Sequence, residues 1–161
     1  MKKLKIYLDT SAIGNLDEPT SPKEMNDMFS LWDEIKQNKY DVIISEITLN
    51  EIYANQNLKK ISTLDTYLSE IEYTTVKVND EVNHVANLVK STGILISDKH
   101  QGDRLHLGCA VVYECDILIS YNFRHLTNIR TIKGIRGISS IAGYGNIDIT
   151  TAAMLIERGD D

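Results

Sequence analysis

Short apolar segments alternate with longer segments of helical periodicity along this chain. Residues 3–8 alternate apolar and polar positions and then become wholly apolar up to Asp9, which is typical of a strand that enters a buried core. Other short runs rich in β-branched residues predict further strands. The expected strands cover residues 3–8, 41–45, 74–78, 116–121 and 147–150.

Between these strands, apolar residues recur every three or four positions, which predicts amphipathic helices. The first helix has the clearest start, because Ser21 and Glu24 form a capping-box pattern with Pro22 at the first helical position. Residues 123–145 contain four glycines and are expected to form loops and short elements. Further helices are expected over residues 46–55, 58–71, 82–89 and 103–114, with a short one after residue 150.

Alternating strands and helices predict an α/β fold with a parallel sheet covered on both faces and joined by right-handed crossovers. The 161 residues contain no repeat and no linker-like stretch, so we expect a single domain over residues 1–161. Such sheets bind ligands beyond the carboxyl ends of their strands. Polar residues at that edge are therefore the candidates for function.

Composition excludes several classes of protein. A hydrophobic content of 42% with 25% charged residues is typical of a chain that folds by itself. The 17 Lys and Arg against 23 Asp and Glu give a net charge of −6, which argues against an indiscriminate polyanion binder. Cys109 and Cys115 lack a zinc-ligand spacing and are expected to be free thiols in the core. With no signal peptide and no membrane-span pattern, a cytoplasmic protein is expected.

The charge is unevenly distributed. Between Asp116 and Asp148 there is no acidic residue but there are four basic ones, so this segment carries +4 and the remainder of the chain carries −10. Three interpretations stay open: a contact for a phosphate backbone, a solvated basic loop, or a docking site for an acidic peptide of a partner. The basic residues are Arg124, Arg130, Lys133 and Arg136.

Several acidic residues fall at the carboxyl edge of the predicted sheet. Asp9 directly follows the first strand, Glu46 and Glu51 lie on the helix that leaves the second, and Asp103 begins the helix that leads into the strand ending at Asn122. An isolated Asp after a strand is usually a turn or cap residue. Convergence of several acids at one edge instead favours a chemical site.

Carboxylates gathered in this way need a compensating charge. Two of them 4 Å apart repel by about 4 kcal/mol at an effective dielectric constant near 20. Carboxylate oxygens without His or Cys partners suit Mg²⁺ or Mn²⁺, which retain several waters and bind substrate phosphates. The pattern therefore predicts a nuclease or phosphatase site, in which the metal activates a water and stabilises charge on the phosphoryl group.

Four motifs occur in order along the chain: YLDTSAI (7–13), ISEITLNEI (44–52), DRLHLGCA (103–110) and CDILISYNFRHL (115–126). Together they resemble the PIN domain, and in particular the virulence-associated protein C (VapC) ribonucleases of toxin–antitoxin pairs. The resemblance covers almost the whole chain. It implies a Rossmann-like three-layer α/β/α sandwich and Mg²⁺- or Mn²⁺-dependent cleavage of RNA.

The resemblance also implies roles for individual residues. Asp9, Glu51 and Asp103 match the metal-binding acids, with Glu46 as an alternative to Glu51. Asn122 stands where many members have a fourth Asp, so a second metal and full activity are in doubt. The resemblance makes substrate binding by Thr10 and Ser11 plausible. Ser120, from its place at a strand end, and Arg124 and Arg130, from the basic segment, are the other predicted substrate-binding residues.

Other polar residues near these positions have structural alternatives. Thr10 or Ser11 could instead cap a helix. His106 lies one helical turn after Asp103, and His125 follows Asn122 by three positions. We expect both histidines to be packed, hydrogen-bonded residues, because a bound metal would already generate the nucleophile.

Two hypotheses follow from the sequence. The first is a metal-dependent endoribonuclease, which would be a homodimeric toxin neutralised by a cognate antitoxin. The second is a PIN scaffold that has lost catalysis through Asn122 and serves as an RNA- or protein-binding module. A nucleotide-binding protein is disfavoured because neither glycine-rich phosphate-binding motif occurs.

Overall fold

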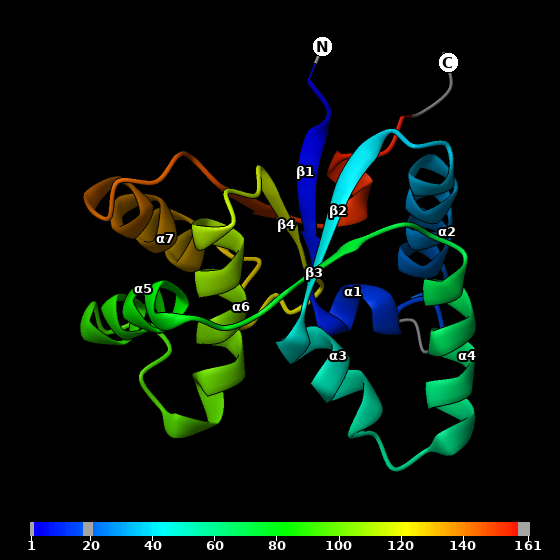
Figure 1. The fold of residues 1–161 in the computed structure, drawn as a ribbon, viewed down its shortest axis with the longest axis horizontal. Coiled ribbons are helices and arrows are strands. Elements are labelled where there is room, and N and C mark those ends of the chain that lie inside the picture. Colours follow the sequence, from blue (N-terminus) through cyan, green and yellow to red (C-terminus); the bar gives the residue numbers. More distant parts are fainter. Residues whose placement is uncertain (1, 18–20, 158–161) are drawn as a thin grey trace.

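The computed structural model describes residues 2–17 and 21–157, and its centre is a parallel β-sheet (Figure 1). Within this part of the chain the sheet has five strands in the order β3-β2-β1-β4-β5, all parallel. The prediction of an α/β fold with a parallel sheet is confirmed. The strands are β1 (Leu4–Leu8), β2 (Tyr40–Ser45), β3 (Thr74–Val76), β4 (Ile117–Ile119) and β5 (Asp148–Thr150).

Helices cover both faces of the sheet and make it the middle of three layers (Figure 1). On one side pack α1 (Thr10–Gly14), α2 (Pro22–Lys36), α3 (Glu46–Tyr53) and α4 (Leu58–Ser69), with the 3₁₀-helix η2 (Ala152–Met154). On the other side pack α5 (Asp80–Ser91), α6 (Gln101–Val112) and α7 (Ile129–Ile141), and the 3₁₀-helix η1 (Asp98–His100) directly precedes α6. None of the described helices is long and apolar enough to span a bilayer.

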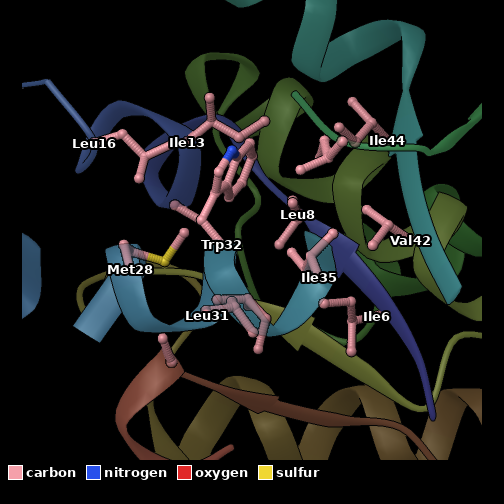
Figure 2. Close-up of a cluster of buried hydrophobic side chains, with 14 of the residues drawn as sticks. Ile6, Leu8, Ile13, Leu16, Met28, Leu31, Trp32, Ile35, Val42 and Ile44 are labelled. Carbon is pink, nitrogen blue, oxygen red and sulfur yellow. The ribbon is translucent and has the colours of Figure 1, made fainter. Parts of the chain in front are cut away.

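Each face of the sheet has its own hydrophobic core because side chains alternate along the strands. In β1, Ile6 and Leu8 pack against α2 around Trp32, in the cluster drawn in Figure 2. Tyr7 points to the opposite face, into the core formed with α5, α6 and α7. Burial on both faces explains why the strand reads as an apolar run.

The sequence places most element boundaries within a few residues. Ser21 caps α2 by accepting the Glu24 N–H, and Pro22 occupies the first turn as predicted. Cys109 and Cys115 are free and buried, and burial raises the pKa of each thiol to about 12. The prediction of inert core thiols is therefore confirmed.

The expectation of loops over residues 123–145 is wrong. A 13-residue helix, α7, spans Ile129–Ile141 and is capped by Asn128, whose side chain accepts the Thr131 N–H. Gly134 made the segment read as loop, yet a Cβ at that position would collide with the side chain of Ile94. This glycine permits close packing of the helix.

The strand order fixes where a ligand site can form. The chain moves from β1 outward to β2 and β3 and then returns to place β4 on the other side of β1. The carboxyl ends of β1 and β4 therefore flank the point at which the strand order reverses, where ligands of open α/β sheets bind. Asp9 follows β1, and residues 120–122 follow β4.

Candidate functional site

Asp9 lies at the centre of this edge and is held by its neighbours in sequence. Its Oδ1 accepts the Ala12 N–H and the Ser11 hydroxyl, both at 2.8 Å, so Asp9 itself is the N-cap of α1. The residue is 3% exposed. Burial raises the pKa of its carboxyl, although His106 and hydrogen bonds from Ser120, Ala12 and Ser11 oppose the rise. Neither Thr10 nor Ser11 caps the helix.

Two serines connect the end of β1 to the end of β4. The hydroxyl oxygens of Ser11 and Ser120 lie 3.3 Å apart, and Ser11 Oγ also accepts the Tyr121 N–H at 2.9 Å. Ser120 Oγ in turn accepts the Asn122 N–H at 3.1 Å. These bonds fix the segment that carries Asn122 against the segment that carries Asp9.

Glu51 reaches this edge from α3 and pairs with His106 of α6. Its Oε1 lies 2.5 Å from His106 Nε2 and accepts the Thr10 hydroxyl at 2.9 Å. Partial burial raises the pKa of Glu51, but the hydrogen bond and charge of His106, together with Thr10, bring the net pKa below its ordinary value. Glu51 Oε2 also lies 3.5 Å from where a Cβ on Gly102 would stand, so α3 and the start of α6 meet at this carboxylate.

On the core side of its ring, His106 is held by a buried series of hydrogen bonds through Tyr7 and Ser45. The Tyr7 hydroxyl lies 2.6 Å from both His106 Nδ1 and Ser45 Oγ. Burial raises the pKa of Tyr7 well above its ordinary value, so the phenol keeps its proton. The phenol can therefore donate to Ser45 Oγ or to His106 Nδ1, and Nε2 on the opposite side of the ring faces Glu51.

Asp103 forms a second carboxylate–histidine pair on the other side of Asp9. Its Oδ2 lies 2.9 Å from His125 Nδ1, and its Oδ1 lies 3.5 Å from Asn122 Nδ2. Asn122 Oδ1 accepts the His125 N–H at 3.1 Å, so the amide oxygen serves the turn after β4. The Asn122 side chain therefore presents its NH₂ group to Asp103.

The three acids matched to metal binding thus join one hydrogen-bonded edge, but they are not assembled around a common point. In the described part of the chain, no three His, Cys, Asp or Glu side chains are grouped so that they could hold a metal ion. The oxygen donors suit Mg²⁺ or Mn²⁺ in type. Glu51, whose side chain is 45% exposed, would have to turn from His106 toward Asp9 to complete such a set.

Two other carboxylates lie outside this network. Glu46 Oε2 accepts the Val78 N–H at 2.7 Å and thereby fixes the segment after β3. Asp116 lies before β4, at the opposite edge of the sheet, where it accepts the Lys5 N–H at 2.8 Å. The structure thus places Glu51, and not Glu46, in contact with the other candidate residues.

The basic segment does not form one strip. Arg136 pairs with Asp148, which follows it in the chain. Arg124 and Arg130 instead line a groove of about 460 Å³ together with Lys99, His100 and His125. His100, which sequence reasoning missed, packs edge-on against His125 with ring centroids 4.4 Å apart. Its position three residues before Asp103 was the one available signal.

Structural comparison places the chain among known folds. No protein-family model and no curated protein matches it. A chain in the crystal structure of VapBC2 from Rickettsia felis, bound to a DNA fragment from their promoter, superposes with a TM-score of 0.60 at 17% identity. The match covers 91% of this chain and 98% of that chain. The protein therefore has the PIN-like α/β/α fold that the sequence motifs led us to expect.

Proposed function

We propose that the protein is a metal-dependent endoribonuclease that hydrolyses RNA phosphodiester bonds. One observation carries this proposal: Asp9, Glu51 and Asp103 come from three separate elements to the edge where the strand order of the sheet reverses. Hydrogen bonds through Ser11, Ser120 and Asn122 link Asp9 to Asp103, and Glu51 is bonded to Thr10, the sequence neighbour of Asp9. Glu51 and Asp103 are each paired with a histidine, and a divalent cation would compensate the charge of all three carboxylates at this edge.

Asp9, Glu51 and Asp103 are the residues that would hold Mg²⁺ or Mn²⁺. When bound, such an ion supplies an activated water and stabilises negative charge on the phosphoryl group. Asp9 is fixed by the start of α1, whereas Glu51 and Asp103 are held by histidines that they must leave or share. Thr10 provides a hydroxyl group that positions Glu51, and Ser11 and Ser120 provide hydroxyl groups that position Asp9.

The decisive experiment removes one carboxylate at this edge. Asp103→Asn should lower Mg²⁺- or Mn²⁺-dependent cleavage of RNA at least about a hundredfold, because metal-ion stabilisation of the reaction amounts to several kcal/mol. Asp116→Asn is the matched control, since it makes the same change at the opposite edge. If folded Asp103→Asn cleaves as fast as the unmodified protein, the proposed site is wrong.

A second candidate function rests on Asn122. Its amide gives the site one carboxylate fewer, and its oxygen is already engaged by the His125 N–H. A protein of this kind would bind RNA or a protein without cutting. Measurable RNA binding without cleavage of an RNA panel in Mn²⁺ would favour this alternative over the nuclease.

We further propose that the chain acts as the toxin of a toxin–antitoxin pair and forms a homodimer. The fold that it shares with a chain of the VapBC2 complex supports the toxin assignment. Light scattering of the purified chain tests the dimer. Co-purification with the product of a small neighbouring reading frame, and recovery of cell growth on its coexpression, tests the antitoxin.

A further inference from the structure

A basic groove lies directly beside the carboxylate edge. Two regions that are distant in sequence line it: residues 93–100, which include the end of η1, and residues 124–131, which include the turn after β4 and the start of α7. His125 belongs both to this groove and to the Asp103 pair. The groove of about 460 Å³ is therefore continuous with the proposed catalytic edge.

The cations of this groove have no carboxylate partners among the described residues. Lys99, Arg124 and Arg130 are exposed and form no ion pair there, whereas Arg136 on the same helix as Arg130 pairs with Asp148. Arg130 lies in the first turn of α7, which contains no acidic residue. A cation at the positive end of a helix dipole is unfavourable unless an anion compensates it. The groove thus concentrates uncompensated positive charge.

His100 gives a second indication of a missing partner. Both of its ring nitrogens are buried and neither forms a hydrogen bond within the described part of the protein. Burial lowers the pKa of its imidazole, His125 and Lys99 lower it further and Arg104 adds a little, while Asp103 acts in the opposite direction. Buried polar nitrogens without partners are rare in folded proteins, so His100 leaves unmet hydrogen-bonding capacity beneath the groove.

We propose that this groove binds the RNA strand at a phosphate next to the scissile phosphate, through Arg124, Arg130 and Lys99. The inference rests on the proposed ribonuclease function, because it takes the strand to continue from the carboxylate edge. The lining favours a phosphate chain over an acidic peptide, since its large apolar side chains are confined to Ile94 and Leu95. Arginine guanidinium groups match phosphate oxygens in geometry as well as in charge.

The test measures RNA binding without catalysis. A fluorescein-labelled single-stranded RNA is titrated with the full-length protein in EDTA between 50 and 200 mM salt. Arg124→Gln combined with Arg130→Gln should flatten the slope of log affinity against log salt by about 1.4, because each phosphate contact to a single strand contributes about 0.7. Over this salt range, the variant should therefore lose about sevenfold less affinity than the unmodified protein.

The control variant removes the same charge outside the groove. Lys133→Gln combined with Arg136→Gln also lies on α7 and should leave the slope near that of the unmodified protein. Equal slopes for the two double variants overturn the proposal, as does an absence of RNA binding in EDTA. A parallel titration with polyglutamate represents an acidic peptide. If Arg124→Gln with Arg130→Gln weakens binding of polyglutamate but leaves RNA binding unchanged, the proposal is also overturned. If the slope changes as expected but no metal supports cleavage, the groove stands and the ribonuclease assignment falls.

Discussion

The two carboxylate–histidine pairs at the candidate site differ in how firmly their histidines are held. His106 is 3% exposed and is fixed on its far side by the Tyr7 hydroxyl at 2.6 Å. The side chain of His125 is 28% exposed and lies at the rim of the basic groove. The exposure of the two carboxylates is reversed: the side chain of Glu51 is 45% exposed, whereas that of Asp103 is 18% exposed.

This difference separates the parts of the site that can move from those that cannot. On the Glu51 side the histidine belongs to the core and the carboxylate is the adjustable member. On the Asp103 side the carboxylate is the more buried member and the histidine faces the groove. To hold a metal ion, Glu51 would have to leave a buried histidine, whereas Asp103 would have to leave or share a histidine that is partly exposed.

Removal of each histidine is the strongest way to break this comparison. His106→Ala leaves the Tyr7 hydroxyl without its partner and opens a buried cavity, so it should lower the free energy of unfolding by about 3 kcal/mol. His125→Ala should cost about 1 kcal/mol or less, because partly exposed ion pairs contribute little. Urea denaturation followed by circular dichroism measures both values.

Tyr7→Phe separates the cavity from the hydrogen bond. It retains the ring but leaves His106 Nδ1 and Ser45 Oγ without this partner, so an intermediate loss of about 1–3 kcal/mol is expected. Equal losses for His106→Ala and His125→Ala would show that the two pairs are equally important for folding. The contrast between a fixed and an adjustable histidine would then be wrong.

A second carboxylate on the Asp103 side sharpens the comparison with a smaller effect. Asn122→Asp places a like charge beside Asp103, whose Oδ1 lies 3.5 Å from the Asn122 amide nitrogen. A divalent cation relieves that repulsion, so Mn²⁺ affinity measured by calorimetry should rise about tenfold, equivalent to about 1.4 kcal/mol.

Asn128→Asp is the matched control for this experiment. It introduces the same charge at the N-cap of α7, where Asp is as good a cap as Asn. Asn128 lines the basic groove, but its side chain bonds to the Phe123 and Arg124 carbonyls and not to the three carboxylates. Mn²⁺ affinity should not change in this variant. Unchanged affinity in Asn122→Asp as well would mean that the Asp103 side takes no part in metal binding.

The sequence predicts the fold more completely than it predicts the contacts within the candidate site. Apolar runs such as residues 3–8 identify strands because burial on both faces of a sheet leaves an unambiguous pattern. α7 was missed, although isoleucines recur every three residues from Ile129 to Ile141, because Gly134 and Gly137 suggested a loop. Gly134 leaves room for the side chain of Ile94, which is 40 positions earlier in the chain. The neighbouring residues in sequence therefore do not show why a glycine stands there.

Site residues were predictable as positions but not as partners. As candidates, Asp9 and Asp103 follow from their places at a strand end and a helix start, whereas the choice of Glu51 over Glu46 came from the family resemblance. That Glu51 pairs with His106 depends on how α3 packs against α6, and that Asn122 turns its oxygen to the His125 N–H depends on the turn after β4. Such contacts join segments that are far apart in sequence, so no local pattern of residues predicts them.

Unlike Glu51 and Asp103, Asp9 has no histidine hydrogen-bonded to its carboxylate. Replacing Asp9 is therefore expected to have the smallest effect on stability. Asp9→Asn keeps a side-chain oxygen for the cap of α1, so the helix should form as before. It also removes a buried charge. At pH 7 we expect an unchanged or higher melting temperature, together with the loss of metal-dependent cleavage.

The pH dependence of this variant tests the cause. Burial raises the pKa of Asp9 above its ordinary value of 3.8, so the folded state binds its proton more tightly than the unfolded state does. The favourable contribution of Asp9 is fully present below pH 3.8 and is lost as the pH rises through the raised pKa. The melting temperature of Asp9→Asn relative to the unmodified protein should therefore be higher at pH 7 than at pH 4. A relative melting temperature that falls with pH would mean that Asp9 is stabilised as a carboxylate, as Glu51 is by His106.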